Sequence, residues 1–314
     1  MSSKKTGDAV VLLYCSLAFP PTNQHQTDNQ RRTYMEGPIC PDKPKKMLVC
    51  TDGSENSRAA LMEALALAQT CGGQIYLLQV VVIIPEFEAA APDLMDLVGE
   101  EVGKQLEVAK AEAAEIGVTL VPRTGRGVSV SGTILAEADE IQPDMIVMGR
   151  HGRTGLARLL VGSITARVIG HSHFNVLVVP KGATISFGRI LVACDGSPYS
   201  QAAFEEALGM ARRQESRLFA VSVATEEGEI PRAKEHIQKM LAAANQAGVP
   251  FQGAVPQGLA PDDGIVQVAI KNEVDLIVMG SHGRTGLKKL LMGSVTERVL
   301  GMSPCPVLVV KKGG

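Results

Sequence analysis

Glycine and serine recur at fixed spacing in two long segments of the chain, and this spacing suits the binding of a phosphate. The segments read MGRHGRTGLARLLVGSITARVIG at residues 148–170 and MGSHGRTGLKKLLMGSVTERVLG at residues 279–301. Each contains the pattern G-x2-G-x9-G-S directly after an apolar run, MIVM or LIVM, of strand type. Glycines just past a strand let backbone N–H groups approach a phosphate closely. A Gly-Ser pair that opens a helix adds an N-terminus that favours anions. The sequence therefore predicts the same phosphate-binding turn twice.

A carboxylate follows the first predicted strand of each half. Asp52 and Asp195 each begin an Asp-Gly-Ser triplet. In an open α/β sheet, ligands bind beyond the carboxyl ends of the strands, so each carboxylate is expected at the crevice, where it could accept from ribose hydroxyls. The alternative is an Asx-turn or a cap for the helix that follows. Ser54 and Ser197 are the better candidates for the N-cap itself.

The elements that must position these residues alternate between strand and helix from residue 45, which is typical of a parallel, doubly wound α/β sheet. In the first half we expect strands at residues 47–51, 74–84, 119–124, 145–148 and 176–179, and helices at residues 57–70, 93–116, 133–141 and 163–170. We expect five parallel strands per half in the flavodoxin-like or Rossmann-like order 3-2-1-4-5. Strands one and four then flank the point where strand order reverses.

The second half repeats the first. RILVAC at residues 189–194 matches KMLVCT at residues 46–51 with an offset of 143, but from residues 117 and 248 onward the offset is 131, so the second half is 12 residues shorter. Aligned cores around a connection of different length are expected of a duplicated domain. We predict an unstructured extension at residues 1–44 and two tandem domains at residues 45–183 and 184–314.

The composition disfavours several other classes of protein. A net charge of −2, 4% aromatic residues and no tryptophan disfavour nucleic-acid binding. The six cysteines form no CxxC pair and have no histidine cluster beside them, so no metal site is predicted, and unpaired cysteines suit a reducing cytoplasm. No apolar run reaches the ~20 residues of a membrane span. Residues 9–19 imitate a signal peptide only faintly, because no small-residue cleavage site follows them. We expect a cytoplasmic protein without membrane or nucleic-acid partners.

The order of the elements, the two glycine motifs and the two Asp-Gly-Ser triplets resemble the universal stress protein family over about residues 45–313. In that family the glycine pattern marks members that bind ATP. The resemblance therefore implies ATP as the ligand, with Mg²⁺ or Mn²⁺ as an option through the phosphates. It also implies that the last strands, residues 176–179 and 307–310, join the halves as an internal pseudo-dimer. The resemblance leaves open whether two whole chains also form a homodimer.

The resemblance also assigns roles to single residues. The aspartates would lie against the adenosine, backbone groups of Val80 and Val223 would meet the adenine edge, and the glycine motifs would hold the phosphates. The residues expected at the nucleotide are Asp52, Gly53, Val80, Met148, Gly149, His151, Gly152, Gly162, Ser163, Ile164 and Thr165 in the first half, and Asp195, Gly196, Val223, Met279, Gly280, His282, Gly283, Gly293, Ser294, Val295 and Thr296 in the second. The alternative is a tight turn with an N-cap serine that exists without a ligand. A valine at Gly162 or Gly293 should block the phosphate and resist any positive φ.

No catalytic residue is predicted. The chain has no G-x4-G-K-[ST], no G-x-G-x-x-G after a first strand, and no base with an acidic partner placed to attack a phosphate. His151 and His282 are best interpreted as loop residues that hydrogen-bond backbone or phosphate. Arg153 and Arg284 are either phosphate contacts or solvated charges. The leading hypothesis is an ATP-binding stress-response regulator. The alternatives are a slow ATPase or self-phosphorylating protein, with Ser163 or Ser294 as acceptor, and a nucleotide-independent interaction module.

Overall fold

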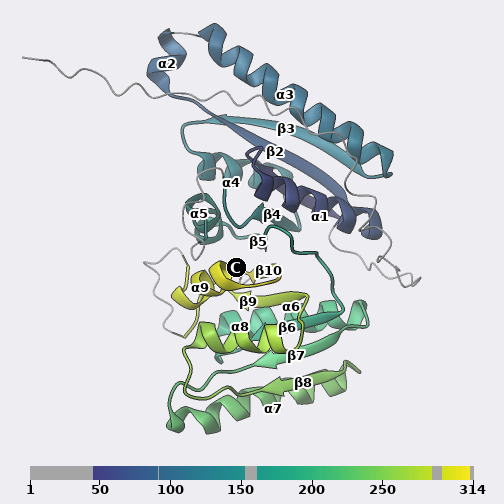
Figure 1. Ribbon diagram of the computed structural model, residues 1–314, viewed down its shortest axis with the longest axis vertical. Helices are drawn as coiled ribbons and strands as arrows, with labels where there is room; N and C mark the ends of the chain where they lie inside the picture. The colour runs from purple at the N-terminus through teal and green to yellow at the C-terminus, as the bar shows by residue number, and fades with distance from the viewer. Residues whose placement is uncertain (1–44, 91, 153–160, 285–291, 312–314) are drawn as a thin grey trace, which may run out of the picture. The chain divides into compact units, whose positions relative to one another are not determined.

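The computed structural model describes residues 45–90, 92–152, 161–284 and 292–311, so the predicted extension at residues 1–44 lies outside the described residues. Strands and helices alternate through both halves (Figure 1). The first half contains β1 (Lys46–Thr51), α1 (Glu55–Cys71), β2 (Gln74–Val82), α2 (Pro85–Ala90), α3 (Pro92–Glu115), β3 (Thr119–Gly127), α4 (Val130–Ile141), β4 (Met145–Gly149), α5 (Ser163–His171) and β5 (Asn175–Val179). The second half contains β6 (Arg189–Ala193), α6 (Pro198–Arg213), β7 (Arg217–Val221), the short 3-10 helix η2 (Glu227–Glu229), α7 (Ile230–Gln246), β8 (Phe251–Ala254), α8 (Pro261–Lys271), β9 (Leu276–Gly280), α9 (Ser294–Met302) and β10 (Val307–Val310).

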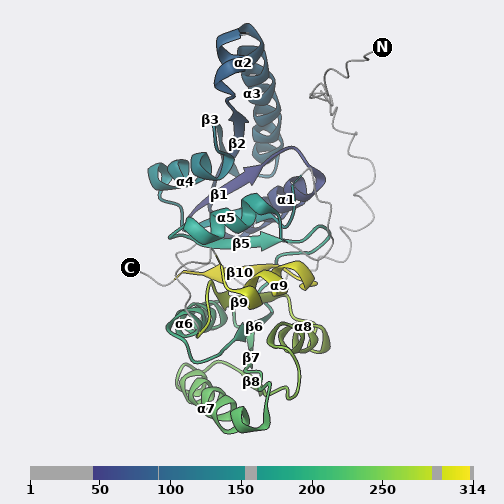
Figure 2. The ribbon, with the colours of Figure 1, turned by 90° about the vertical axis from the view of Figure 1, so that its left-hand side faces the viewer.

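The ten strands of the described residues form one sheet in the order β3-β2-β1-β4-β5-β10-β9-β6-β7-β8. Pairing is parallel within each half, and strands one and four of each half, β1 with β4 and β6 with β9, are neighbours. The halves meet where β5 and β10 pair in antiparallel fashion, with Val178 opposite Val307 and Val176 opposite Val309 (Figure 2). The predicted α/β class with two doubly wound halves is confirmed.

The strands are buried on both faces, as parallel strands between two helical layers must be. Met47 and Val49 of β1 belong to one core cluster, with side chains from α1 and α3, whereas Leu48 and Cys50 point to the other, with α4 and α5. Each cluster continues into the second half, where α6 and α7 cover one face and α8 and α9 the other. This alternation has the period of two that a strand imposes.

The second and third strands differ from the prediction. The second strand was expected to reach residue 84, but β2 ends at Val82 and the short helix α2 follows it. The third was expected to end at residue 124, but β3 continues to Gly127, which pairs with Val82. The glycines and arginines of this stretch have little intrinsic strand preference. The longer strand therefore depends on its partner β2 rather than on local sequence.

The cysteines of the described residues are not all unpaired. Cys50, Cys194 and Cys305 are free, but Cys71 takes part in a disulfide. The expectation of unpaired cysteines is therefore wrong at Cys71, and the argument for a reducing compartment loses that support. In the described part of the chain, no helix has the length and apolar character to cross a membrane.

Two cations cross the join between the halves and meet the ends of helices. Arg150 Nη1 donates to the Gly301 carbonyl at 3.1 Å, and its Nη2 donates to that of Ser303, at the end of α9. Lys311 Nζ donates to the Ile169 carbonyl in the last turn of α5. A helix C-terminus carries partial negative charge and unpaired carbonyls, so it favours cations. Each half thus supplies the C-terminal cap of a helix in the other, and burial lowers the pKa of Lys311 to about 8.

The serines predicted as N-caps occupy those positions. Ser54 and Ser197 accept from the backbone N–H groups of Ser57 at 3.3 Å and of Ser200 at 3.1 Å, respectively. In contrast, Gly293 is the N-cap of α9, so Ser294 is its first helical residue. We expect Ser197→Ala to lower the free energy of unfolding by about 1 kcal/mol, because a buried helix start loses its acceptor. Ser294→Ala is the matched control and should leave urea denaturation unchanged; equal losses would show that the cap contributes nothing specific.

Candidate functional site

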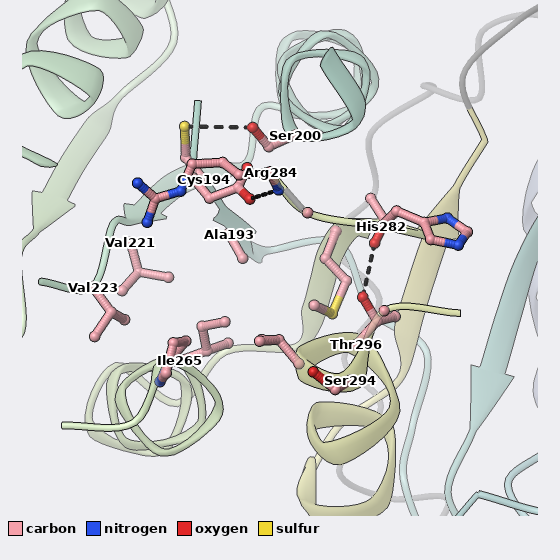
Figure 3. A pocket seen from close by; sticks show the side chains of 17 residues that line it. Ala193, Cys194, Ser200, Val221, Val223, Ile265, His282, Arg284, Ser294 and Thr296 are labelled. Atoms are coloured by element: carbon pink, nitrogen blue, oxygen red, sulfur yellow. Dashed lines mark hydrogen bonds between the residues drawn. The ribbon is translucent and has the colours of Figure 1, made fainter. Parts of the chain in front are cut away.

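A cavity of ≈ 280 Å³ lies in the second half, at the carboxyl ends of β6, β7 and β9 and beside the first turn of α9 (Figure 3). This is the point where strand order reverses, because β6 pairs with β7 on one side and β9 on the other. Ligands of doubly wound sheets bind at such points. Ten of the eleven residues predicted for the second half line the cavity: Asp195, Val223, Met279, Gly280, His282, Gly283, Gly293, Ser294, Val295 and Thr296. The eleventh, Gly196, has a φ of 78° in the turn beside it.

Part of the cavity wall was not predicted. Ala193, Val221 and Ile265 give it an apolar surface, and Cys194, Ser200 and Pro261 also line it. Arg284, which was expected either at a phosphate or in solvent, completes the lining. Ile265 lies on α8 and is only 4% exposed. In the sequence it looks like any apolar residue on the buried face of a helix. The one available signal was the position of α8, whose first turn follows the third strand of the second half.

The two aspartates have the same local structure. Asp52 Oδ1 accepts from the Ser54 N–H at 3.0 Å, and Asp195 Oδ1 accepts from the Ser197 N–H at 2.9 Å. The Asx-turn that was the structural alternative is therefore present in both halves. The second oxygen has a different role: Asp195 Oδ2 faces the residues after β9 and accepts from the Arg284 N–H at 2.8 Å.

The ionised form of Asp195 is favoured. Burial acts to raise its pKa, but hydrogen bonds from Ser197, from the Arg284 N–H and from Ser200 outweigh burial and lower it. Asp195 is thus a half-buried anion at the edge of the cavity, with one oxygen committed to the turn and the other directed across the opening.

Two glycines of each motif are required by close contacts. A Cβ at Gly283 would lie 2.7 Å from Asp195 Oδ2, and one at Gly152 would lie 2.7 Å from Asp52 Oδ2. A Cβ at Gly280 would lie 2.7 Å from the Tyr199 Cβ, where α6 packs on the strand end, and Gly149 has a similar contact with α1. The first pair lets a carboxylate approach the loop, whereas the second pair is needed for packing with or without a ligand.

The third glycine of each motif differs from the prediction. Gly162 and Gly293 have φ of −59° and −66°, so the expected resistance of valine to positive φ does not apply. They are N-caps of α5 and α9, and the serines that follow are first helical residues, which corrects the alternative of an N-cap serine. A Cβ at Gly293 would lie 3.3 Å from the His282 Cα, so the loop folds closely over this position.

The start of α9 is open toward the cavity. In the described part of the chain, no side chain caps it, and its first backbone bond runs from the Glu297 N–H to the Gly293 carbonyl at 3.0 Å. The three residues between these, Ser294, Val295 and Thr296, all line the cavity. Their N–H groups belong to the first turn, which has no intrahelical acceptors and carries the positive end of the helix dipole. The Thr296 hydroxyl itself donates to the Gly280 carbonyl at 3.0 Å and ties the helix to β9.

The histidines are loop residues. His282 Nδ1 lies 3.2 Å from Ser281 Oγ, its ring centroid lies 5.4 Å from that of Tyr199, and Figure 3 shows the imidazole pointing away from the cavity. Burial, and then the charge of Arg150, lowers the pKa of His151. In the first half the position of Ser281 is taken by Arg150, whose side chain crosses to α9 instead.

The first half repeats the arrangement around β1 and β4. Gly53 has a φ of 75°, Thr165 Oγ1 donates to the Gly149 carbonyl at 3.1 Å, and Met148 is buried while Ile164 and Ser163 are exposed. Val80, which was expected at the adenine edge, lies inside β2. Its counterpart Val223 lies two residues beyond β7, where it lines the cavity. Arg153 lies outside the described residues.

The chain belongs to the universal stress protein family, whose profile matches residues 43–180 and again residues 186–311. A universal stress protein of Mycolicibacterium smegmatis is 29% identical over 289 residues, covering 84% of this chain and 96% of its own. The protein Slr1230 of Synechocystis is 28% identical and is covered over its whole length, with 85% of this chain aligned.

Solved structures share the fold. A universal stress protein from Archaeoglobus fulgidus superposes with a TM-score of 0.68 at 23% identity, over 87% of this chain and 100% of its own. A Pseudomonas aeruginosa protein of unknown function, PA1789, superposes with a TM-score of 0.63 at 21% identity, over 86% of this chain and 94% of its own. The chain is thus a tandem member of the family, with two family domains in one polypeptide.

Proposed function

We propose that the two domains, residues 45–183 and 184–314, each bind an adenine nucleotide, with ATP as the preferred ligand, and that occupancy regulates the protein in a stress response. One observation carries this proposal. An ionised carboxylate, Asp195, and the N-terminus of α9, which no described side chain caps, line the same cavity at the point where the strand order reverses. A nucleotide has complementary parts: hydroxyls for the carboxylate and phosphates for the helix start.

The wall of the cavity divides in the same way. The apolar residues Val221, Val223 and Ile265 would receive the base, and the ribose hydroxyls would donate to Asp195. The phosphates would lie against the backbone N–H groups of Gly293 to Thr296. Among the described residues, no group of three or more His, Cys, Asp or Glu is placed to hold a metal ion. An Mg²⁺ or Mn²⁺ ion would therefore be bound through the phosphates.

A regulatory role is better supported than rapid hydrolysis. General-base catalysis needs a side chain within hydrogen-bond reach of the attacking group. Of the titratable residues at the cavity, His282 points away from it, burial raises the pKa of the Cys194 thiol, and Asp195 would be occupied by the ribose hydroxyls. Slow hydrolysis or transfer to Ser294 would show as ADP release or as a phosphorylated chain during long incubation.

Binding of two ATP molecules per full-length chain is the expected result of isothermal titration calorimetry. AMP, ADP and cyclic AMP serve as competitors, and the nucleotide released when the purified protein is denatured identifies the natural ligand. We expect ATP to bind more tightly than AMP, because only ATP extends to the first turn of the helix. A folded chain that binds none of these ligands would contradict the proposal and favour an interaction module that keeps the turns for folding alone.

A further inference from the structure

A chain of polar contacts crosses the opening of the second cavity. Glu229 Oε2 accepts from the Thr225 N–H at 2.9 Å and from its hydroxyl at 2.6 Å. Glu229 Oε1 lies 3.2 Å from Arg284 Nη2, and the Arg284 backbone N–H donates to Asp195. The series joins the segment after β7, η2, the loop after β9 and the turn after β6. It was not predicted, because its members are far apart in the sequence.

This network holds Arg284 at two points, its backbone and its guanidinium group. Asp195 holds the backbone, and Glu229 holds the guanidinium group. Hydrogen bonds from Thr225 and from Arg284 lower the pKa of Glu229 to about 2, so the ion pair persists at neutral pH. Although both partners are partly exposed, at 41% for Arg284 and 32% for Glu229, the arginine is not a freely solvated charge.

The guanidinium lies on the side of the cavity opposite to the helix start. Its partner Glu229 is anchored on Thr225, in the segment that follows β7. In contrast, Ser294 and Thr296 lie in the first turn of α9. Figure 3 shows Arg284 reaching toward the side of Val221 and Val223, with Ile265 across the cavity from it. A planar group and an apolar surface thus line the same cavity of ≈ 280 Å³.

We infer that Arg284, oriented by Glu229, stacks on the base of the nucleotide in the second domain and forms one wall of a base subsite, opposite Ile265. This inference rests on the proposed function and names the part of the ligand that the residue recognises. An arginine plane stacks readily on aromatic rings, and pairing with a carboxylate leaves its faces available. Because Glu229 already balances its charge, the guanidinium is not set to bind a phosphate.

The Thr225 anchor of this network has no counterpart in the sequence of the first domain. At the offset of 143, the counterpart of Thr225 is Val82, which has no hydroxyl to anchor a carboxylate and is the last residue of β2. We therefore assign the anchored arginine to the second domain, where the proposed nucleotide would be held in a way that Val82 cannot reproduce.

Adenosine and ATP distinguish a base contact from a phosphate contact. We would titrate both ligands into the full-length chain, unmodified and with Gly162→Val to silence the first site. Arg284→Gln and Arg284→Lys should each lower the affinities for adenosine and for ATP by the same factor, about three- to thirty-fold, because neither replacement keeps the guanidinium plane. Glu229→Gln should weaken both ligands by a smaller common factor, because the plane stays but loses its orientation.

Arg189→Gln is the matched control. Arg189 also pairs with a glutamate, Glu273, and is similarly exposed, but it lies at the opposite end of β6 from the cavity. This variant should bind both ligands like the unmodified chain. If Arg284→Gln lowered the affinity for ATP but not for adenosine, the residue would contact a phosphate and not the base. If neither affinity changed, Arg284 would contact no part of the ligand. Failure of the proposed function looks different, since the unmodified chain would then bind neither ligand.

Discussion

Replacing Gly293 with valine is expected to reduce the number of ATP molecules bound per chain from two to one. Gly293 is the N-cap of α9, and a Cβ there already lies 3.3 Å from the His282 Cα. The Cβ would also lie 3.5 Å from the Ser281 carbonyl oxygen and 3.6 Å from the Gly283 nitrogen, so the two further methyl groups would crowd this loop and the first-turn N–H groups beside it. Each hydrogen bond to a charged phosphate contributes about 1.5–3 kcal/mol. Loss of two such bonds weakens the second site by on the order of 100-fold or more.

Calorimetry on the full-length chain measures the stoichiometry directly. Gly162→Val is the matched variant of the first half and should remove the other site. The double variant should bind no ATP while it remains folded by circular dichroism. If the single variants lose their thermal transition, the glycines serve packing rather than binding. Two ATP molecules bound to Gly293→Val would show that the helix start does not hold the phosphates.

Replacing Arg150 with methionine is expected to lower the free energy of unfolding by about 2–4 kcal/mol, because the carbonyls of Gly301 and Ser303 would lose their donors inside the join between the halves. Gly301 and Ser303 are buried, so water cannot replace the guanidinium at their carbonyls without rearrangement. The loss is moderated because the charge is itself costly: burial lowers the pKa of Arg150, and its Nε has no hydrogen-bond partner among the described residues.

Urea denaturation of the full-length chain tests this effect. Arg123→Met is the control, because Arg123 pairs with Glu137 and Glu140 near the surface and should contribute no more than about 1 kcal/mol. Equal stabilities of the two variants would mean that the contacts across the join add nothing beyond strand pairing.

The turns after β6 could be predicted from the sequence because their causes are local. The Asx-turn at Asp195 and the N-cap at Ser197 each depend on residues two or three positions away. The duplication helped as well, because two copies of one pattern are rarely accidental. The start of α9 required the structure, since Gly-Ser is compatible with either residue as the N-cap.

The other features depend on contacts between distant residues. Ile265 is part of the second core cluster and of the cavity wall, and its apolar character alone cannot separate the two roles. The pair Glu229–Arg284 joins residues 55 positions apart, across a strand order that the sequence only implies. The extension of β3 to Gly127 requires the pairing with β2. In each case the decisive partner lies in another element.

The antiparallel pairing of β5 with β10 takes place inside one polypeptide, with residues 180–188 as the connection. Separate single-domain chains that paired through such strands would dissociate as they were diluted. A short covalent connection instead supplies an effective concentration on the order of millimolar for the second partner. Both helix ends that are capped from the opposite half therefore stay capped however few copies of the protein the cell contains. The pairing of the two halves therefore does not depend on the concentration of the protein.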